Sequence, residues 1–152
     1  MGASDTHTVP FFIGGEEIVT EKTFEIVNPA TGKAIHKCSS ASDADALAAV
    51  EAAAKAFPAW RDLVPRKRRD ILLKAAEVLE RRRDELAGYM IEETGVPRGW
   101  ADFNLDVAKD FIIDVAGRIS GLEGTIPTTQ DPGVGALVLK EPFGVILAIA
   151  PW

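Results

Sequence analysis

Few side chains in this sequence could perform covalent chemistry, and Cys38 is its only thiol. A nucleophilic cysteine needs a base or a helix N-terminus that holds it as thiolate. Cys38 follows Lys37 on a short predicted strand, where neighbouring side chains point to opposite faces. We therefore interpret Cys38 as an incidental thiol. A single cysteine also excludes an internal disulfide framework and a zinc site made of several thiolates.

The histidines and paired carboxylates do not complete a catalytic set. His7 lies in a polar N-terminal stretch and His36 in a polar strand, with no clear acid partner for either, so we predict surface histidines. Glu92 and Glu93 are adjacent at the end of a predicted helix, where successive side chains point about 100° apart. We expect surface positions for both carboxylates, and an acid–base pair is the less favoured alternative.

Signals for nucleotide and nucleic-acid binding are weak. Gly133 and Gly135 begin a loose glycine pattern, but the third glycine of the dinucleotide fingerprint is absent and a predicted strand follows instead of a helix. The basic runs 66–69 and 81–83 alternate with acidic residues on the outer side of amphipathic helices, which favours a solvated face. The net charge of -6 also argues against nucleic acid and anionic membranes as partners.

The predicted elements begin with a mobile polar tail over residues 1–8 and continue as a small β-meander. Gly14-Gly15 predicts a hairpin, a third strand covers 24–27, and an Asn-Pro turn leads to a strand over 33–37. Helices are predicted over 42–58, from 65 towards 93 with or without a break, and over 98–119. Ser42 with Asp45 predicts a capping pair, and Gly95 predicts a helix stop.

Two strands are predicted after residue 121, over 136–140 and 145–150. The second is apolar on every side, which predicts burial on both faces of a parallel sheet. Ligands gather beyond the carboxyl ends of such strands, so residues 149–152 would border a crevice, although core packing of Trp152 explains its position equally well. The helix expected after Pro151-Trp152 is missing, so we expect the sequence to be cut there.

Length and composition set the class of protein. The 152 residues are 47% hydrophobic and 26% charged, which is enough for one compact unit. The longest apolar run is too short to cross a bilayer and the N-terminus lacks a signal-peptide apolar region. We expect no membrane partner and a cytoplasmic location.

Several segments, in this order, resemble the NAD(P)-dependent aldehyde dehydrogenases. They are FIGGEE, FEIVNPATGKAI, the Ala-rich stretch ending in Phe57-Pro58-Ala59-Trp60, ILLKAAEVLERRRDELAGYMIEETG, Thr125-Ile126-Pro127, EPFGV and the closing IAPW. One departure is Glu123-Gly124, which inverts the family's usual Gly-Glu order before Thr-Ile-Pro. This inversion affects the local path of the chain and leaves the family resemblance intact.

The resemblance implies an α/β fold. Residues 9–123 would form the N-terminal part of a Rossmann-type cofactor domain with a β-hairpin at its start, 124–142 an oligomerisation arm, and 143–152 the first core strand of the cofactor domain, truncated. NAD or NADP would place its nicotinamide side near Ile149, Ala150, Pro151 and Trp152. The arm would pair with a partner subunit in a homodimer or homotetramer.

The resemblance also implies a substrate class. Trp100, Phe103 and Asn104 look like the tunnel wall of members that oxidise aromatic aldehydes such as benzaldehyde, vanillin or salicylaldehyde. The competing interpretation is that Trp100 and Phe103 pack this helix on the sheet. The family's oxyanion asparagine, nucleophilic cysteine and general-base glutamate come after the Pro-Trp pair, so no catalytic residue and no metal ligand is assigned.

The family reaction runs from aldehyde to carboxylic acid through a cysteine thiohemiacetal and a thioester. Without the nucleophile and base, the 152 residues alone should be inactive. The alternative hypothesis is a non-catalytic truncated remnant that acts only by pairing its strands with another subunit.

Overall fold

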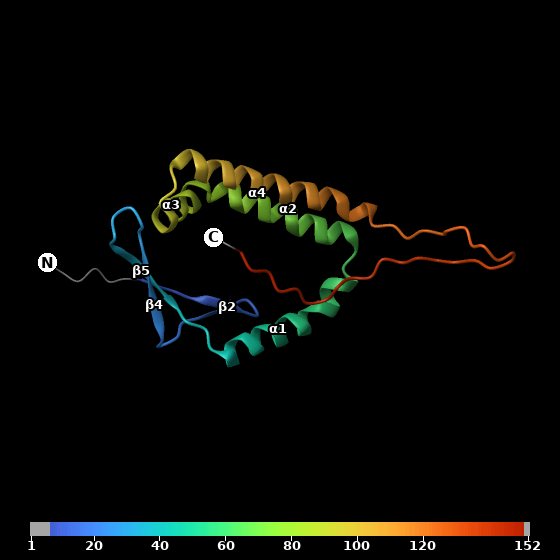
Figure 1. The fold of residues 1–152 in the computed structure, drawn as a ribbon, viewed down its shortest axis with the longest axis horizontal. Helices are drawn as coiled ribbons and strands as arrows, with labels where there is room; N and C mark the ends of the chain where they lie inside the picture. The colour runs from blue at the N-terminus through green and yellow to red at the C-terminus, as the bar shows by residue number, and fades with distance from the viewer. Residues whose placement is uncertain (1–6, 151–152) are drawn as a thin grey trace.

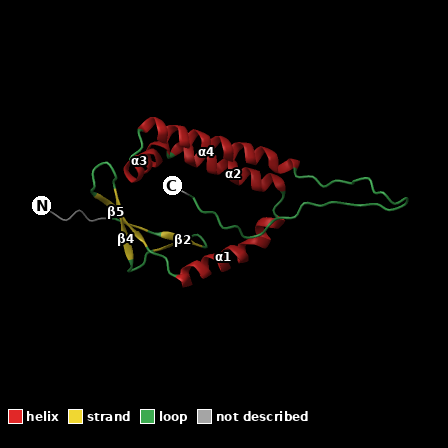
Figure 2. Cartoon of the chain, viewed as in Figure 1, coloured by secondary structure: helices red, strands yellow, loops and turns green. Residues whose placement is uncertain are grey.

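The structure is a computed structural model that describes residues 7–150. Figure 1 shows strands at the N-terminal end, long helices beyond them and an extended arm that projects away from the helices, and Figure 2 shows the same division between strand, helix and loop. Helices and strands are thus combined in an α/β fold. The helices follow the strands along the chain.

Five short strands form two separate sheets. They are β1 (Thr8–Val9), β2 (Phe11–Ile13), β3 (Glu16–Ile18), β4 (Thr23–Val27) and β5 (Ala34–Ser39). β2 and β3 pair antiparallel, while the other sheet has the order β1-β5-β4. Gly14 and Gly15 connect β2 to β3 with φ of 63° and 92°, which a two-residue turn of this kind needs.

The predicted single meander is wrong in its strand order. β1 pairs parallel with β5, with Thr8 opposite Lys37, so Thr8 belongs to a strand and not to the predicted tail. β4 pairs antiparallel with the other edge of β5. A central strand needs partners on both edges, and β1 supplies the second one.

α1 (Asp43–Asp62) begins as predicted but runs past its predicted end. Ser42 Oγ accepts from the Asp45 amide at 3.3 Å and the Asp45 carboxylate accepts from the Ser42 amide at 2.7 Å, which confirms the capping pair. Pro58 lies inside the helix. It removes one backbone donor, and the helix ends four residues later, where Arg68 donates to the carbonyl of Leu63 at 2.5 Å.

Three further helices form the main body of the molecule. They are α2 (Pro65–Arg81), α3 (Arg83–Thr94) and α4 (Arg98–Arg118), followed by a short 3-10 turn, Ile119–Gly121. The second predicted helix, from 65 towards 93, is divided in two by a break at Arg82. Gly95 ends α3 with φ 73°, and its amide donates to the Ile91 carbonyl at 2.9 Å, which confirms the predicted stop.

Small residues bring α3 and α4 close together. Ala87 and Ala101 are fully buried and Leu105 is 6% exposed. The surrounding apolar side chains are Leu79, Leu86, Met90, Ile91 and Val96. Ion pairs join both helices to α2, where Arg83 of α3 and Lys109 of α4 each lie 2.9 Å from Glu80. The helices are thus held by a narrow apolar seam and a charged edge.

The C-terminal part departs most from prediction. In place of a strand over 136–140, the structure has a single antiparallel bridge between Thr125 and Val138. The predicted buried strand over 145–150 is not a strand, and Leu147 and Ile149 are 84% and 85% exposed. A strand forms only against a neighbour that takes its backbone hydrogen bonds, and no described strand lies beside this segment.

None of the helices within residues 7–150 combines the length and the apolar character needed to cross a membrane.

Candidate functional site

The predicted substrate residues share the first turns of α4. The rings of Trp100 and Phe103 lie with centroids 5.4 Å apart and planes tilted by 34°. They are 49% and 54% exposed among the described residues, and the alternative that they pack α4 on a sheet stays open. Asn104 Nδ2 donates to the Trp100 carbonyl at 2.8 Å. The aromatic pair is therefore available to a guest, whereas the amide is already engaged within its helix.

A groove of about 340 Å³ lies beside this aromatic pair. Its lining consists of Met90, Thr94, Val96 and Trp100, from the end of α3, the following turn and the start of α4. The Thr94 hydroxyl donates to the Met90 carbonyl at 2.6 Å and is thereby used. The groove offers a flat apolar wall and no acid or base, so it can hold an apolar molecule but cannot activate one.

Half of the predicted cofactor contacts can be located. Ile149 and Ala150 are exposed, whereas Pro151 and Trp152 lie outside the described residues. Ile149 presents an exposed apolar side chain, at 85%. Neither Ile149 nor Ala150 lines the groove beside Trp100.

Sequence reasoning missed a contact between a strand and a helix. His36 Nε2 on β5 lies 3.2 Å from Glu93 Oε1 at the end of α3, so His36 does have an acid partner, contrary to prediction. The His36 side chain is 13% exposed and that of Glu93 41%. The two residues are far apart in the sequence. The available signal was alternation on β5, which places His36 and Cys38 on one face, combined with a carboxylate at a helix end.

The same carboxylate affects the thiol. Burial, and after it the charge of Glu93, raise the pKa of Cys38. A nucleophilic cysteine needs the opposite shift, which supports the interpretation of Cys38 as an incidental thiol. Among residues 7–150, no three His, Cys, Asp or Glu side chains gather as a metal site would require.

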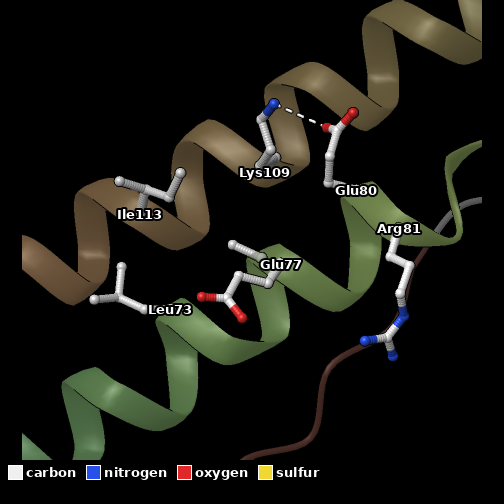
Figure 3. A pocket seen from close by; sticks show the side chains of 7 residues that line it. Leu73, Glu77, Glu80, Arg81, Lys109 and Ile113 are labelled. Atoms are coloured by element: carbon white, nitrogen blue, oxygen red, sulfur yellow. Dashed lines mark hydrogen bonds and ion pairs between the residues drawn. The ribbon is translucent and has the colours of Figure 1, made fainter.

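A groove of the described chain between α2 and α4 shares no lining residue with the groove beside Trp100. It encloses about 620 Å³, and its lining is Leu73, Ala76, Glu77, Glu80, Arg81, Lys109 and Ile113. Figure 3 shows Lys109 paired with Glu80 across it, with Arg81 turned away from Lys109. Hydrogen bonds from Arg83 and Lys109 lower the pKa of Glu80 to about 2, so this carboxylate is fixed as an anion. The groove contains no nucleophile and no free base.

The basic runs of α2 and α3 are largely paired. Arg66 lies 3.8 Å from Asp70, Arg82 2.7 Å from Glu85, and Arg68 donates to carbonyls at the end of α1. These contacts support the solvated-face interpretation.

Comparison with known proteins gives consistent matches in sequence and fold. A sequence model described as "Aldehyde dehydrogenase family" matches residues 17–152. Vanillin dehydrogenase of Pseudomonas fluorescens is 41% identical over 149 residues, with 95% of this chain covered and 30% of that protein. The chain thus spans about 30% of the length of the curated relative that it matches.

Two solved structures are similar in fold. A salicylaldehyde dehydrogenase from Pseudomonas putida G7, complexed with salicylaldehyde, has a TM-score of 0.82 and 27% identity, with 90% of this chain and 28% of that chain covered. An NAD-dependent benzaldehyde dehydrogenase from Corynebacterium glutamicum has a TM-score of 0.76 and 30% identity, with 82% of this chain and 28% of that chain covered.

Proposed function

The chain belongs to the aldehyde dehydrogenase family, and from that premise we propose that it forms the N-terminal portion of an enzyme that oxidises an aromatic aldehyde to its carboxylic acid with NAD or NADP. The observation that carries the substrate class is the half-exposed pair of Trp100 and Phe103 beside an apolar groove. Aromatic side chains at 5.4 Å centroid spacing offer edges and faces to a third ring. The similar proteins named vanillin and salicylaldehyde dehydrogenase support the same class.

The cofactor proposal rests on the family and on the C-terminal segment. NAD or NADP, when bound, accepts the hydride of the aldehyde. Ile149 and Ala150 would border its nicotinamide, together with Pro151 and Trp152. In the domain scheme that we propose, residues 9–123 form the first part of the cofactor domain and 143–152 lead into its first core strand. The location proposed is the cytoplasm, and neither nucleic acid nor a membrane is proposed as a partner.

We propose that the arm, residues 124–142, pairs with another subunit in a homodimer or homotetramer. Figure 1 shows it as the orange extension that projects from the helices. Its two sides are joined by the bridge from Thr125 to Val138, with amide–carbonyl distances of 2.9 and 2.8 Å. Leu137 and Leu139 are 65% and 66% exposed. Apolar side chains beside unpaired backbone favour strand addition from a partner.

The total surface supports contact with further polypeptide, whether the rest of the proposed enzyme or another subunit. The chain exposes 11947 Å², whereas a compact monomer of this mass exposes roughly 7,500 Å². Much apolar surface therefore lies open. Covering such surface is the main source of free energy in protein association.

The test is an assay of the polypeptide expressed from its natural reading frame, after its intact mass has been compared with 16.3 kDa. We expect aldehyde-dependent formation of NADH or NADPH with benzaldehyde, vanillin or salicylaldehyde. Trp100→Leu should raise the KM for these aldehydes. Phe111→Leu is the control, because Phe111 is an exposed aromatic residue of the same helix, at 65%, and lines a different groove. Equal effects of the two variants would refute the role of Trp100.

The arm and the alternative hypothesis have their own tests. Leu137→Asp should reduce the molar mass measured by light scattering, while Gln130→Asp at the exposed tip should not. The isolated 152 residues should form no NADH, and turnover by them alone would refute the assignment of catalysis to residues beyond Trp152. A natural polypeptide of 16.3 kDa that associates through its arm and shows no turnover would favour the non-catalytic alternative.

A further inference from the structure

The turn between α3 and α4 leads into the helix that carries the aromatic pair, and two contacts join this region to β5 and to the turn before it. One is the contact between His36 Nε2 and Glu93 Oε1 at 3.2 Å. The other is at Gly95, where an added Cβ would lie 3.0 Å from Cγ of Pro29, so the proline ring already lies close to the Gly95 backbone. The first contact comes from β5 and the second from the turn between β4 and β5.

These contacts lie next to the proposed substrate groove. Glu93 immediately precedes Thr94, and Thr94, Val96 and Trp100 line the groove. Trp100 lies in the first turn of α4, three residues after Pro97. A change in the direction of the turn at residues 94–97 would therefore shift Trp100 relative to Met90, which also lines the groove.

We propose that His36 and Glu93 are positioning residues that fix the aromatic substrate wall by tying the end of α3 to β5. The proposal rests on the proposed function for its substrate, but the contact itself is present in the described chain. Neither side chain lines the groove, so neither is a catalytic residue. Partly exposed contacts between polar or charged side chains stabilise a fold only slightly. We accordingly expect the substitutions to change the position of Trp100 and to have little effect on global stability.

The chain offers a matched control. Glu92 carries the same charge one position earlier, is exposed, and makes no ion pair among the described residues. Glu93→Gln and Glu92→Gln thus remove the same charge from neighbouring positions, and only the first weakens the contact with β5. Adding His36→Gln to Glu93→Gln should cause no further change, because both substitutions disrupt one interaction.

Steady-state kinetics of the enzyme expressed from its natural reading frame test the proposal. We expect His36→Gln and Glu93→Gln each to raise the KM for vanillin or salicylaldehyde by about 3- to 10-fold, with kcat within twofold of the unchanged enzyme, roughly. The KM for acetaldehyde, which is too small to need the aromatic wall, should not change. Equal KM values for the aromatic aldehydes in Glu93→Gln and Glu92→Gln would overturn the proposal.

A second measurement separates this proposal from the proposed function. Amide hydrogen exchange over residues 94–100 should be faster in His36→Gln and Glu93→Gln than in the unchanged protein, and unaltered in Glu92→Gln. If the enzyme shows no aldehyde turnover but does show this exchange pattern, the proposed function is refuted. The proposal that His36 and Glu93 fix the end of α3 against β5 would still stand. Unaltered exchange in all three variants would overturn the tie itself.

Discussion

Replacing Gly95 by alanine tests whether the end of α3 is held by the turn that precedes β5. Gly95 has φ 73°, and an added Cβ would lie 3.0 Å from Cγ of Pro29. Two penalties are expected. A left-handed backbone costs an L-residue about 1–2 kcal/mol, and contact well inside the usual 3.5–4.0 Å between carbons adds about 1 kcal/mol more, because a proline ring has little freedom to move away.

Gly32→Ala is the matched control for the backbone penalty. Gly32 has φ 68°, nearly the same as Gly95, but an added Cβ would meet nothing within 4 Å. Alanine also restricts the unfolded chain, which offsets about 0.4–1 kcal/mol in both variants. We therefore expect the free energy of unfolding to fall by about 2 kcal/mol for Gly95→Ala and by about 1 kcal/mol for Gly32→Ala.

Urea unfolding of the purified protein, followed by circular dichroism, measures both losses. The double variant Pro29→Ala/Gly95→Ala should lose less relative to Pro29→Ala than Gly95→Ala loses relative to the unchanged protein, because the obstructing Cγ is gone. Equal losses for Gly95→Ala and Gly32→Ala, or no gain from Pro29→Ala, would refute the contact. A large fall in the m-value would instead show that the transition is not two-state.

Three further results are expected. Leu105→Ala should lower the free energy of unfolding in urea by about 2–4 kcal/mol, because Leu105 is 6% exposed in the seam between α3 and α4; a loss below about 1 kcal/mol would contradict this packing. Cys38 should react with iodoacetamide more slowly than a free thiol at mildly alkaline pH, since its pKa is raised, and Glu93→Gln should speed the reaction; an unchanged rate would refute the influence of that charge. The pKa of Glu80 is lowered from 4.5 to about 2, so the stability that it contributes is present above pH 4.5 and lost as the pH falls towards 2. Glu80→Gln should flatten this acid limb in a pH series of unfolding curves, and a limb of unchanged slope would refute it.

Much of the apolar surface near the candidate site is exposed among the described residues. The groove beside Trp100 has one wall and no acid or base of its own. The exposed segment over 145–150 has no described strand beside it. In the function that we propose, these surfaces bind and orient substrate and cofactor, and the reacting groups come from elsewhere in the polypeptide.

Local chemistry made much of the fold predictable from the sequence. Ser42 with Asp45 fixed the start of α1, Pro65 the start of α2, and Gly95 with its left-handed backbone the end of α3. These signals act within a few residues, through hydrogen bonds and backbone angles that depend on the local residue types. For the same reason, Trp100 and Phe103 could be assigned to one turn of a helix.

Contacts between distant segments could not be predicted in this way. The pairing of β1 with β5, the continuation of α1 past Pro58 and the exposure of residues 145–150 depend on which partner reaches each segment in space. A run of apolar residues indicates that burial is favourable, but it does not identify the helix or strand that packs against it. The pair of His36 and Glu93 shows this most clearly, since 56 intervening residues separate two side chains that the tertiary structure brings to 3.2 Å. The sequence by itself determined most helix boundaries and the family, and only the tertiary structure decided that His36 on β5 lies beside Glu93 at the end of α3, because that contact exists only once the sheet and the helices have packed together.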